Sequence, residues 1–417
     1  MYHKEIFPNG IRVIIEEIPE VRSVTIGVWV SVGSKDESDK ENGISHFLEH
    51  MIFKGTKSKT ALQIAQIMDS MGGHIDASTG REHTCYYAKV LNKHLSHTIE
   101  VLADIFFNSV FNPIEIEKEK QVVIEEIKMY EDTPDDLIHD LFVQTIWNKH
   151  SLGQPIWGKL DVIKNISQDE LINFWISRYT PYEIVIAVAG HVQKNEVINQ
   201  IFKFFGNHTG PNWRTTSDIP ELKSCLNFQF RKLEQVHLCL GTRGLPSTHK
   251  DRYVLKLLNL ILGGGMSSRL FQKIREENAL SYNVHSYPLS YKNAGALVVY
   301  VGTSSKNYKK TTQIILNEFS NLKNELISEE ELLNAKEKIK GALCLNSEDT
   351  AYRMSRLAEQ EIYFNKFFNI EETLELIDKV NITDLKRIAQ EIFKNEYLCL
   401  TTIGPLSKRN GEIVLEC

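Results

Sequence analysis

The sequence predicts an α+β protein made of two homologous α/β domains, each with an antiparallel-rich sheet flanked by helices. Three observations lead to this expectation. The chain has 417 residues, a length that suits two domains of about 200 residues each. Runs of strand length alternate with longer helical segments along the chain. An order of segments seen in the first half also returns in the second half, which indicates an internal duplication.

The duplication rests on two pairs of similar segments. Residues 186–190 (IAVAG) resemble residues 400–404 (LTTIG), so that position 190 corresponds to position 404. The acidic segment 114–120 resembles residues 327–333, at nearly the same offset along the chain. Between the two copies lies a polar stretch that contains Gly and Pro, which is typical of a linker. The expected division is a first domain at 1–207, a linker at 208–222 and a second domain at 223–417.

Composition and charge exclude several classes of protein. Hydrophobic residues make up 42 % of the chain, charged residues 24 %, and the net charge is −6. These are ordinary globular values, so neither disorder nor nucleic-acid binding is indicated. The six cysteines form no CxxC pair and no framework spacing, which fits free thiols in a reducing compartment.

Targeting and membrane signals are also missing from the sequence. Residues 1–10 (MYHKEIFPNG) lack the apolar region of a secretory signal and the Arg-rich, acid-poor character of a transit peptide. No run reaches the roughly 18 apolar residues that a spanning helix needs. We therefore expect a cytoplasmic protein that does not enter a membrane.

The first half begins with strands and continues with helices. The turn Pro8-Asn9-Gly10 leads into an apolar strand from Ile11, and residues 24–32 alternate as a second strand. A polar loop then precedes residues 44–53, which are mostly apolar and predict a largely buried helix. The following elements are expected to be a helix at 61–71, a β-rich stretch at 74–90, a helix at 94–107 and an acidic helix at 114–130.

The expected helix carries the motif His46-Phe47-Leu48-Glu49-His50, which has three titratable positions. Histidines at i and i+4 lie one turn apart on the same helix face, and the glutamate leans toward that face. This arrangement can chelate a metal and place a base beside it, as in zinc hydrolases with the H-x-x-E-H order. Taken alone, the motif also fits a solvated helix face or a satisfied pair of core histidines.

A catalytic zinc ion usually has three protein ligands, so the histidine pair needs a third donor. The acidic helix offers Glu119 and Glu126, which are seven residues apart and lie on one face, whereas Glu125 points elsewhere. The apolar run 122–124 indicates that this helix is partly buried, where an unpaired carboxylate is costly. A solvated acidic face is the alternative interpretation for each of these glutamates.

Residues 43–56 (GISHFLEHMIFKGT), followed by Glu126, resemble the insulinase/pitrilysin family of zinc peptidases. The resemblance is closest to the mitochondrial processing peptidase branch and its bacterial relatives, and it covers nearly the whole chain. It implies one zinc ion per chain, with the ligands His46, His50 and Glu126. It further implies that Glu49 activates the water and that Glu119 supports catalysis.

Two stretches of the first half resemble the family's edge strand, which binds extended substrate through its backbone. These are residues 73–79 (GHIDAST) and 82–87 (EHTCYY). The resemblance implies substrate contacts at Asp76, Ala77 and Thr79. The family usually has asparagine at the position of Asp76, so this chain lacks a side-chain amide donor there. An ordinary amphipathic strand would show the same alternation.

In the second half, residues 263–271 (GGGMSSRLF) lack the Gly-Lys-Ser/Thr ending of a phosphate-binding loop. The resemblance instead implies a glycine-rich element that faces a peptide chamber. Arg275 and Tyr282 are similar to an Arg/Tyr pair that contacts substrate carbonyls near the cleaved bond. A guanidinium and a phenol are suitable donors to a developing oxyanion. Without the resemblance, both would be interpreted as ordinary surface or core residues.

The resemblance implies a zinc-dependent endopeptidase that cleaves extended peptides or unfolded segments inside a closed chamber. Larger relatives close the chamber with four such α/β units, so a chain of two units implies a homodimer in which Arg275 and Tyr282 act in trans. Two alternatives are a non-catalytic structural subunit and a processing-peptidase subunit that needs a different partner chain. The complete set of ligands and base favours an enzyme over a structural subunit.

Overall fold

The computed structural model describes all residues except 212, 214–217, 407–410 and 412. The chain forms two compact units, and each holds one mostly antiparallel sheet with helices, as the sequence predicts. Unit 1 comprises Met1–Lys128, Gln154–Thr216 and Asn346–Phe367, and unit 2 comprises Met129–Gly153, Ser217–Leu345 and Phe368–Cys417.

The domain boundaries that we expect from the sequence remain a prediction. Part of the expected linker 208–222, namely residues 212 and 214–217, lies outside the described residues. Within the described part of the chain, no helix is both long enough and apolar enough to span a bilayer.

The sheet of unit 1 has six strands in the order β1-β2-β6-β3-β5-β4. Strands β2 and β6 are parallel, and all other neighbours are antiparallel. Strand β6 is buried along its whole length, which explains its uninterrupted apolar sequence. Strand β4 forms one edge, and its residues alternate between exposed and half-buried. The strands are β1 (Tyr2–Ile6), β2 (Arg12–Glu17), β3 (Ser23–Val30), β4 (His74–Thr79), β5 (Thr84–Leu91) and β6 (Ile184–Gly190).

The sheet of unit 2 has five strands in the order β7-β11-β8-β10-β9. Here β7 and β11 are parallel and the other neighbours antiparallel. This is the order and direction of β2-β6-β3-β5-β4 in unit 1, and the similar segments that end at positions 190 and 404 are the matching strands β6 and β11. The two sheets therefore share one topology, as an internal duplication predicts. The strands are β7 (Cys225–Phe230), β8 (Val236–Arg243), β9 (Ser281–Ser290), β10 (Gly295–Thr303) and β11 (Cys399–Gly404).

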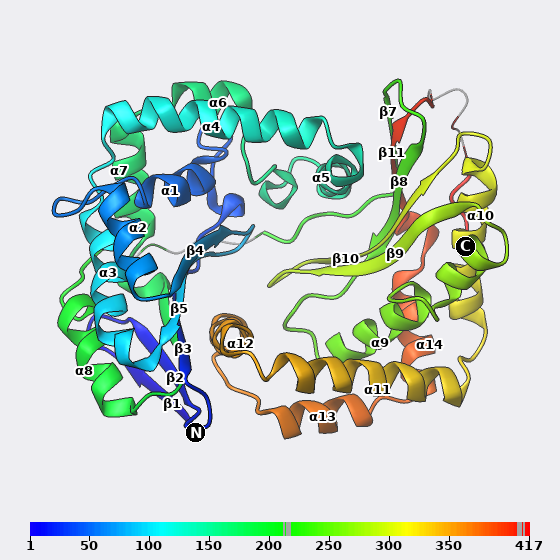
Figure 1. The fold of residues 1–417 in the computed structure, drawn as a ribbon. Coiled ribbons are helices and arrows are strands. Elements are labelled where there is room, and N and C mark those ends of the chain that lie inside the picture. The colour runs from blue at the N-terminus through cyan, green and yellow to red at the C-terminus, as the bar shows by residue number, and fades with distance from the viewer. Residues whose placement is uncertain (212, 214–217, 407–410, 412) are drawn as a thin grey trace. The chain divides into compact units, whose positions relative to one another are not determined.

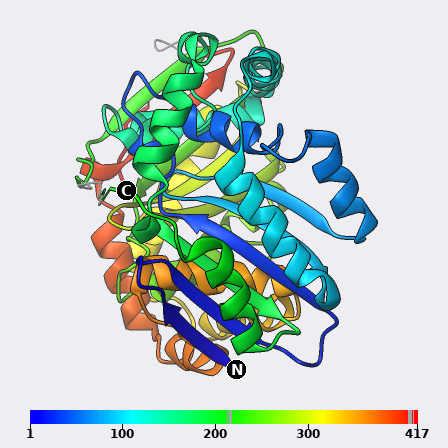
Figure 2. The ribbon, with the colours of Figure 1, turned by 90° about the vertical axis from the view of Figure 1, so that its left-hand side faces the viewer.

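Helices cover both faces of the first sheet. Helices α3 and α8 lie on one face (Figures 1 and 2), where apolar side chains of the sheet form the largest core of unit 1. Helix α12 packs against the other face through Met354 and Leu357, which contact a cluster around Trp29. The helices grouped with this sheet are α1 (Ile44–Ile52), α2 (Ala61–Ser70), α3 (Leu95–Asn108), α4 (Pro113–Glu131), α6 (Leu160–Asn165), α7 (Gln168–Arg178), α8 (Lys194–Phe205) and α12 (Thr350–Phe364).

The second sheet is covered in the same way. Helix α5 packs on one of its faces through Ile138 and Phe142, which join a cluster with Ala296 and Val298. The helices grouped with this sheet are α5 (Pro134–Ile146), α9 (Arg252–Leu262), α10 (Tyr308–Asn324), α11 (Glu329–Asn346), α13 (Ile370–Asp378) and α14 (Ile382–Ile392).

The two halves of the chain exchange one helix each. Helix α5 follows α4 in the first half of the chain but packs in unit 2, whereas α12 comes from the second half and packs in unit 1. The two helices occupy corresponding places in the duplicated sequence, at nearly the offset that relates β6 to β11. Neither helix could be assigned to its sheet from the sequence, because both have an apolar face that fits either one.

We predict that Met354 is required for the packing of α12 on the first sheet. Its sulfur lies 3.1 Å from Trp29 Nε1, and the side chain is 1 % exposed. The substitution Met354→Ala should lower the free energy of unfolding by about 2–4 kcal/mol, because it leaves a cavity in the core. Met129→Ala, at a methionine that is 61 % exposed, is the control and should change this free energy by less than about 0.5 kcal/mol. Urea unfolding followed by tryptophan fluorescence measures both, and equal effects would contradict the packing.

Candidate metal centre

Helix α1 carries the histidine motif and is held by the core on its apolar side. Phe47, Leu48 and Met51 are fully buried, whereas His46 and His50 lie on the half-buried side. Residues three or four positions apart lie on the same side of a helix. Packing of the apolar side against the core therefore turns both imidazoles toward one place.

A buried carboxylate from a preceding loop caps the N-terminus of α1. Glu37 accepts hydrogen bonds from the backbone N–H groups of Gly43 (2.7 Å) and Ser45 (2.8 Å) and from Asn42 Nδ2 (3.2 Å). Burial raises the pKa of Glu37, and the N–H donors oppose this shift. Sequence reasoning missed this residue, because usual capping patterns place the acceptor next to the helix rather than well before it in the chain.

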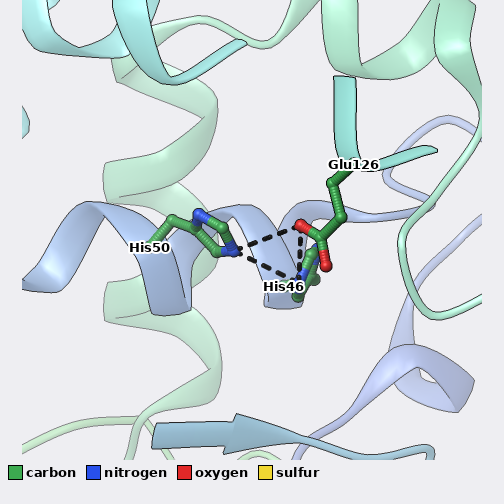
Figure 3. Close-up of side chains that lie close together, drawn as sticks. All are labelled: His46, His50 and Glu126. Carbon is green, nitrogen blue, oxygen red and sulfur yellow. Dashed lines mark hydrogen bonds and ion pairs between the residues drawn. The ribbon is translucent and has the colours of Figure 1, made fainter. Parts of the chain in front are cut away.

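The three predicted ligands come together in unit 1 (Figure 3). His46 Nε2 and His50 Nε2 are 3.3 Å apart, and Glu126 Oε2, from α4, lies 3.8 Å and 3.7 Å from them. In a tetrahedral zinc site with bonds of about 2.0–2.2 Å, ligand atoms are about 3.3–3.6 Å apart. The observed spacing therefore fits a zinc ion after a shift of a few tenths of an ångström.

The chemistry of the donors also fits a metal. Burial, and next the charge of His50, lower the pKa of His46 to about 4, so its imidazole is neutral near pH 7. Neutral imidazole is the form that binds metals. His46 Nδ1 is buried without a hydrogen-bond partner in the described structure.

His50 is oriented by Glu119, which lies two helical turns before Glu126 on α4. Glu119 Oε1 is 2.8 Å from His50 Nδ1, and Glu119 Oε2 is 2.6 Å from Lys54 Nζ. A carboxylate on Nδ1 leaves Nε2 available for a metal and fixes the ring, as outer partners of metal sites commonly do. Burial lowers the pKa of His50, but the hydrogen bond and charge of Glu119 outweigh it and raise the pKa. Lys54 was not identified as part of the site from the sequence.

Glu49 lies beside the three ligands but points toward strand β4. The hydroxyl of Thr79 donates a hydrogen bond to Glu49 Oε2. Burial raises the pKa of Glu49, although this bond and the charge of His50 oppose the shift. The carboxylate is thus held between the motif helix and the edge of the sheet.

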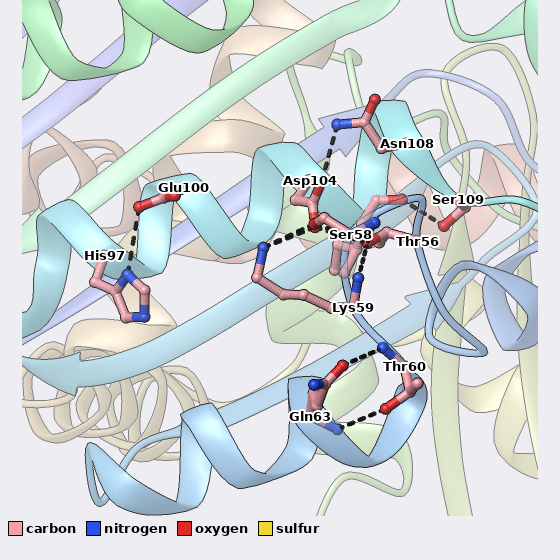
Figure 4. Close-up of polar contacts among 11 residues, drawn as sticks. Thr56, Ser58, Lys59, Thr60, Gln63, His97, Glu100, Asp104, Asn108 and Ser109 are labelled. Atoms are coloured by element: carbon pink, nitrogen blue, oxygen red, sulfur yellow. Dashed lines mark hydrogen bonds and ion pairs between the residues drawn. The ribbon is translucent and has the colours of Figure 1, made fainter.

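The loop that follows α1 is anchored by Asp104 of α3 (Figure 4). Its carboxylate accepts hydrogen bonds from the hydroxyls of Thr56 (2.8 Å) and Ser58 (3.0 Å) and from Lys59 Nζ (3.0 Å). Asn108 Nδ2 binds the other carboxylate oxygen at 2.9 Å. Both ends of the motif helix are therefore fixed, the first by Glu37 and the second by this network.

The predicted substrate residues of unit 1 lie along the edge strand β4. Thr79 reaches Glu49, as described above, and Ala77 is half-buried. The N–H of Ala77 donates to Asp76 Oδ1 at 2.8 Å, and Asp76 Oδ2 lies 3.4 Å from the hydroxyl of Tyr87. The two ends of this part of β4 therefore differ. Thr79 lies next to Glu49 of the metal centre, whereas the side chain of Asp76 is exposed.

In unit 2 the structure brings Arg275 and Tyr282 together. The guanidinium carbon lies 4.4 Å from the centre of the Tyr282 ring and 4.8 Å from that of Phe271, within range of cation–π contact. Tyr282, on strand β9, is 81 % exposed. Their spacing in the chain gave no reason to expect stacking, because a π-helical turn (Phe271–Glu276) ends between the two and a strand begins there.

The second copy has no counterpart of the ligands. The offset that relates position 190 to position 404 places Leu260, Gly264 and Lys340 at the positions of His46, His50 and Glu126. The glycine-rich segment is fixed by other contacts, among them two hydrogen bonds from Arg269 to Glu331, at 2.8 Å and 2.9 Å.

Comparison with known proteins identifies the family. The model of the insulinase family, peptidase family M16, matches residues 12–159, and that of the peptidase M16 inactive domain matches residues 165–339. The chain is 42 % identical to the uncharacterized zinc protease YmxG of Bacillus subtilis, over 95 % of this chain and 97 % of that protein. This chain belongs to the insulinase family M16. A zinc protease of Mycobacterium leprae is 36 % identical, over 96 % and 91 % of the two chains.

Solved structures agree in fold with this member of the M16 family. The peptidase M16 inactive domain of Pseudomonas fluorescens has a TM-score of 0.91 at 18 % identity, over 100 % of both chains. A protease of Helicobacter pylori has a TM-score of 0.89 at 22 % identity, over 97 % of this chain and 99 % of that one. The His46/His50/Glu126 group lies in the stretch that matches the insulinase model, and the half without ligands overlaps the inactive-domain match.

We predict that Glu37 positions the motif helix and thereby the metal ligands. Glu37→Ala leaves two buried backbone N–H groups without their acceptor and removes one of the two hydrogen bonds of the Asn42 amide, so the free energy of unfolding should fall by about 2–4 kcal/mol. Zinc affinity should fall with it, because the N-terminal turn of α1 holds His46. Glu37→Gln keeps the side-chain volume and one oxygen acceptor, and should lose less of both.

Urea unfolding and zinc titration with a competing chelator dye measure the two effects. Glu41→Ala, at a half-buried carboxylate of the loop before α1, is the control for a nearby loss of charge. If Glu37→Ala behaves like Glu41→Ala in both measurements, Glu37 does not hold the helix.

Proposed function

We propose that the protein is a zinc-dependent endopeptidase that cleaves extended peptides or unfolded segments. The observation that carries this proposal is the convergence of His46, His50 and Glu126 with a glutamate, Glu49, beside them and an open strand edge next to that glutamate. A peptide bond, a water molecule and a base can meet there. Membership in a family of zinc peptidases supports the same reaction.

Bound zinc would supply a Lewis acid for the substrate carbonyl and would lower the pKa of an attacking water. Glu49 takes a proton from that water and delivers it to the leaving amine. Its raised pKa suits the first step, because a carboxylate whose pKa is higher is a stronger base toward the water. Water is the nucleophile, so no covalent enzyme intermediate forms. Glu119 holds the His50 ring in place throughout.

Substrate binds as an added strand on β4. An edge strand offers alternate N–H and C=O groups to an extended peptide, which is bound without selection of most side chains. Ala77 and Thr79 provide backbone contacts, and Thr79 also holds Glu49 through its hydroxyl. An extended peptide on this edge passes the carboxylate of Glu49, so we expect folded substrates to be excluded.

Arg275 and Tyr282 complete the proposed site by donating hydrogen bonds to the oxyanion that develops on the substrate carbonyl. Stacking against each other aligns the guanidinium and the phenol. We propose that they act in trans in a homodimer, which encloses the substrate in a chamber. A purely structural subunit would not need three converging ligands and a base, and a subunit with a different partner chain would be inactive alone.

Glu49→Gln should retain zinc and lose activity. We expect kcat/KM for a mixed peptide library to fall by about 10³-fold or more, since proton transfer loses its base. His46→Ala and Glu126→Ala should instead lose zinc, as metal analysis of the purified proteins would measure. Asp69→Asn, on the exposed face of α2, is the control. A Glu49→Gln protein that cleaves at the parent rate would exclude the mechanism.

Mixing two inactive variants tests the action in trans. Glu49→Gln and Tyr282→Phe, each inactive or nearly so, would form mixed dimers in which one site combines an intact Glu49 with an intact Tyr282. Random mixing should restore about a quarter of the parent activity. No recovery from refolded or co-expressed mixtures would show that each chain uses its own pair or that the dimer does not form.

A further inference from the structure

Glu318 of α10 is a buried carboxylate that lies in unit 2, away from the metal ligands in the chain, and is 1 % exposed. Its Oε1 accepts hydrogen bonds from Lys273 Nζ and, at 2.9 Å, from Asn321 Nδ2. Its Oε2 lies 3.9 Å from Arg269 Nη1 and has no hydrogen-bond partner among the described residues. Glu318 therefore joins α10 to two cations that precede Arg275 in the chain.

The two cations belong to the segment that forms the π-helical turn Phe271–Glu276. Arg269 lies just before this turn, and Lys273 lies within it. A buried ion pair adds little to stability, because the cost of removing both charges from water offsets their attraction. A buried carboxylate is nevertheless costly unless its cations stay in place. The pairing with Glu318 therefore restricts where the turn can lie against α10.

The winding of the turn is unusual and decides where its last residues point. The N–H of Glu277 donates to the carbonyl of Gln272, five residues earlier, at 2.9 Å, so the turn holds one residue more than an α-helical turn. Such turns are rare, and they occur frequently at functional sites. A return to α-helical winding would move the end of the turn, where Arg275 lies, by up to about 100° around the helix axis.

Helix α10 also supports the end of this turn. Lys310 Nζ donates a hydrogen bond to Asn278 Oδ1 at 2.8 Å, and Asn278 Nδ2 donates to the carbonyl of Lys273 at 2.8 Å. The next residue, Ala279, has a φ of 48°, in the left-handed region that residues with a Cβ rarely adopt. The contact of Lys310 is exposed to solvent, so the buried contact of Glu318 is the stronger restraint.

The direction of Arg275 follows from the anchors that come just before it. Ile274 is fully buried in the core of unit 2, and Lys273 is held by Glu318. The ion-pair contact of Arg275, with Glu276 at 3.4 Å, is formed within the same turn and cannot anchor it. Lys273 and Ile274 therefore leave the guanidinium of Arg275 over the ring of Tyr282.

From these contacts we infer that Glu318 is a positioning residue, which keeps Arg275 stacked on Tyr282 by holding the π-helical turn through Lys273. This inference rests on the proposed endopeptidase function, in which the Arg/Tyr pair donates hydrogen bonds to the oxyanion. Glu318 does not touch the substrate. Because the oxyanion exists only during the reaction, a loss of alignment lowers kcat and leaves KM nearly unchanged.

Glu318→Gln keeps the size of the side chain but removes its charge. We expect kcat for a peptide substrate to fall about ten-fold, which is part of the roughly 10²-fold loss expected when an oxyanion donor is removed, and KM to change less than about two-fold. Lys273→Met, at a side chain that is 41 % exposed, removes the same contact from the side of the turn. It should have the same effect on kcat, and it replaces Glu318→Gln in every comparison if that protein does not fold.

Glu361→Gln is the matched control for the loss of a buried ion pair. Glu361 is 2 % exposed and is paired with Lys4 at 2.8 Å and Arg12 at 3.6 Å, but it belongs to unit 1. This variant should lose stability in the same way and keep kcat within about two-fold of the parent. A fall in kcat for Glu318→Gln that is no larger than for Glu361→Gln would overturn the inference.

A second comparison, in the Arg275→Ala background, separates positioning from a general structural effect. If Glu318 acts through Arg275, adding Glu318→Gln to Arg275→Ala should lower kcat no further. If Glu318→Gln lowers kcat by the same factor with and without Arg275, the two residues act independently and the inference fails.

Hydrogen exchange followed by mass spectrometry tests the turn without an activity assay. The N–H groups of Glu277, Ala279 and Leu280 donate to carbonyls of the turn at 2.9–3.1 Å. They should exchange faster in Glu318→Gln and at the parent rate in Glu361→Gln. If the parent cleaves no peptide but this exchange is faster, the endopeptidase proposal fails and the hold of Glu318 on the turn stands. Unchanged exchange in Glu318→Gln overturns the inference, while cleavage by the parent still supports the endopeptidase.

Discussion

The site depends on one constraint, which is that a helix with three titratable side chains must pack into an apolar core. Helix α1 meets it because nearly every polar group on it has a partner from another element: Glu37 for the N–H groups at its start, Thr79 for Glu49, and Glu119 for His50. Two atoms of the helix are exceptions, because His46 Nδ1 and Ser45 Oγ are buried without a hydrogen-bond partner in the described structure. These contacts come from a loop, an edge strand and α4. The hydrogen bonds that satisfy the polar groups of the buried helix therefore also fix the positions of the base, Glu49, and of α4, which carries the third ligand, Glu126.

The duplication explains how such a site can exist in only one of two similar units. Both sheets have the same order and directions of strands, so the packing that supports α1 in unit 1 recurs in unit 2 without ligands at the matching positions. The second copy therefore does not need to bind a metal. Its glycine-rich segment, Arg275 and Tyr282 can have another function. The exchange of α5 and α12 ties the two halves: each sheet buries one face under a helix that the other half supplies, so neither half of the chain contains a complete core by itself.

Much of this could be predicted from the sequence, because the signals are local. The motif helix, expected at 44–53, is observed at Ile44–Ile52, and the acidic helix expected at 114–130 is Pro113–Glu131. The seven-residue spacing on that helix correctly placed Glu119 and Glu126 on one face. Contacts between distant segments could not be predicted in the same way. Glu37 and Lys54 carry no pattern of their own, and the stacking of Arg275 on Tyr282 depends on a π-helical turn that periodicity does not reveal. The exchanged helices have an apolar face that fits either sheet, so only packing decides between them.

Asp76 shows how one residue can protect an exposed strand edge. An unpaired edge strand invites pairing with other chains, and a charged side chain that also occupies an edge N–H makes indiscriminate pairing less favourable. The carboxylate lies on the exposed face of the strand, so it leaves undisturbed the contact of Thr79 with Glu49, which is made from the other face.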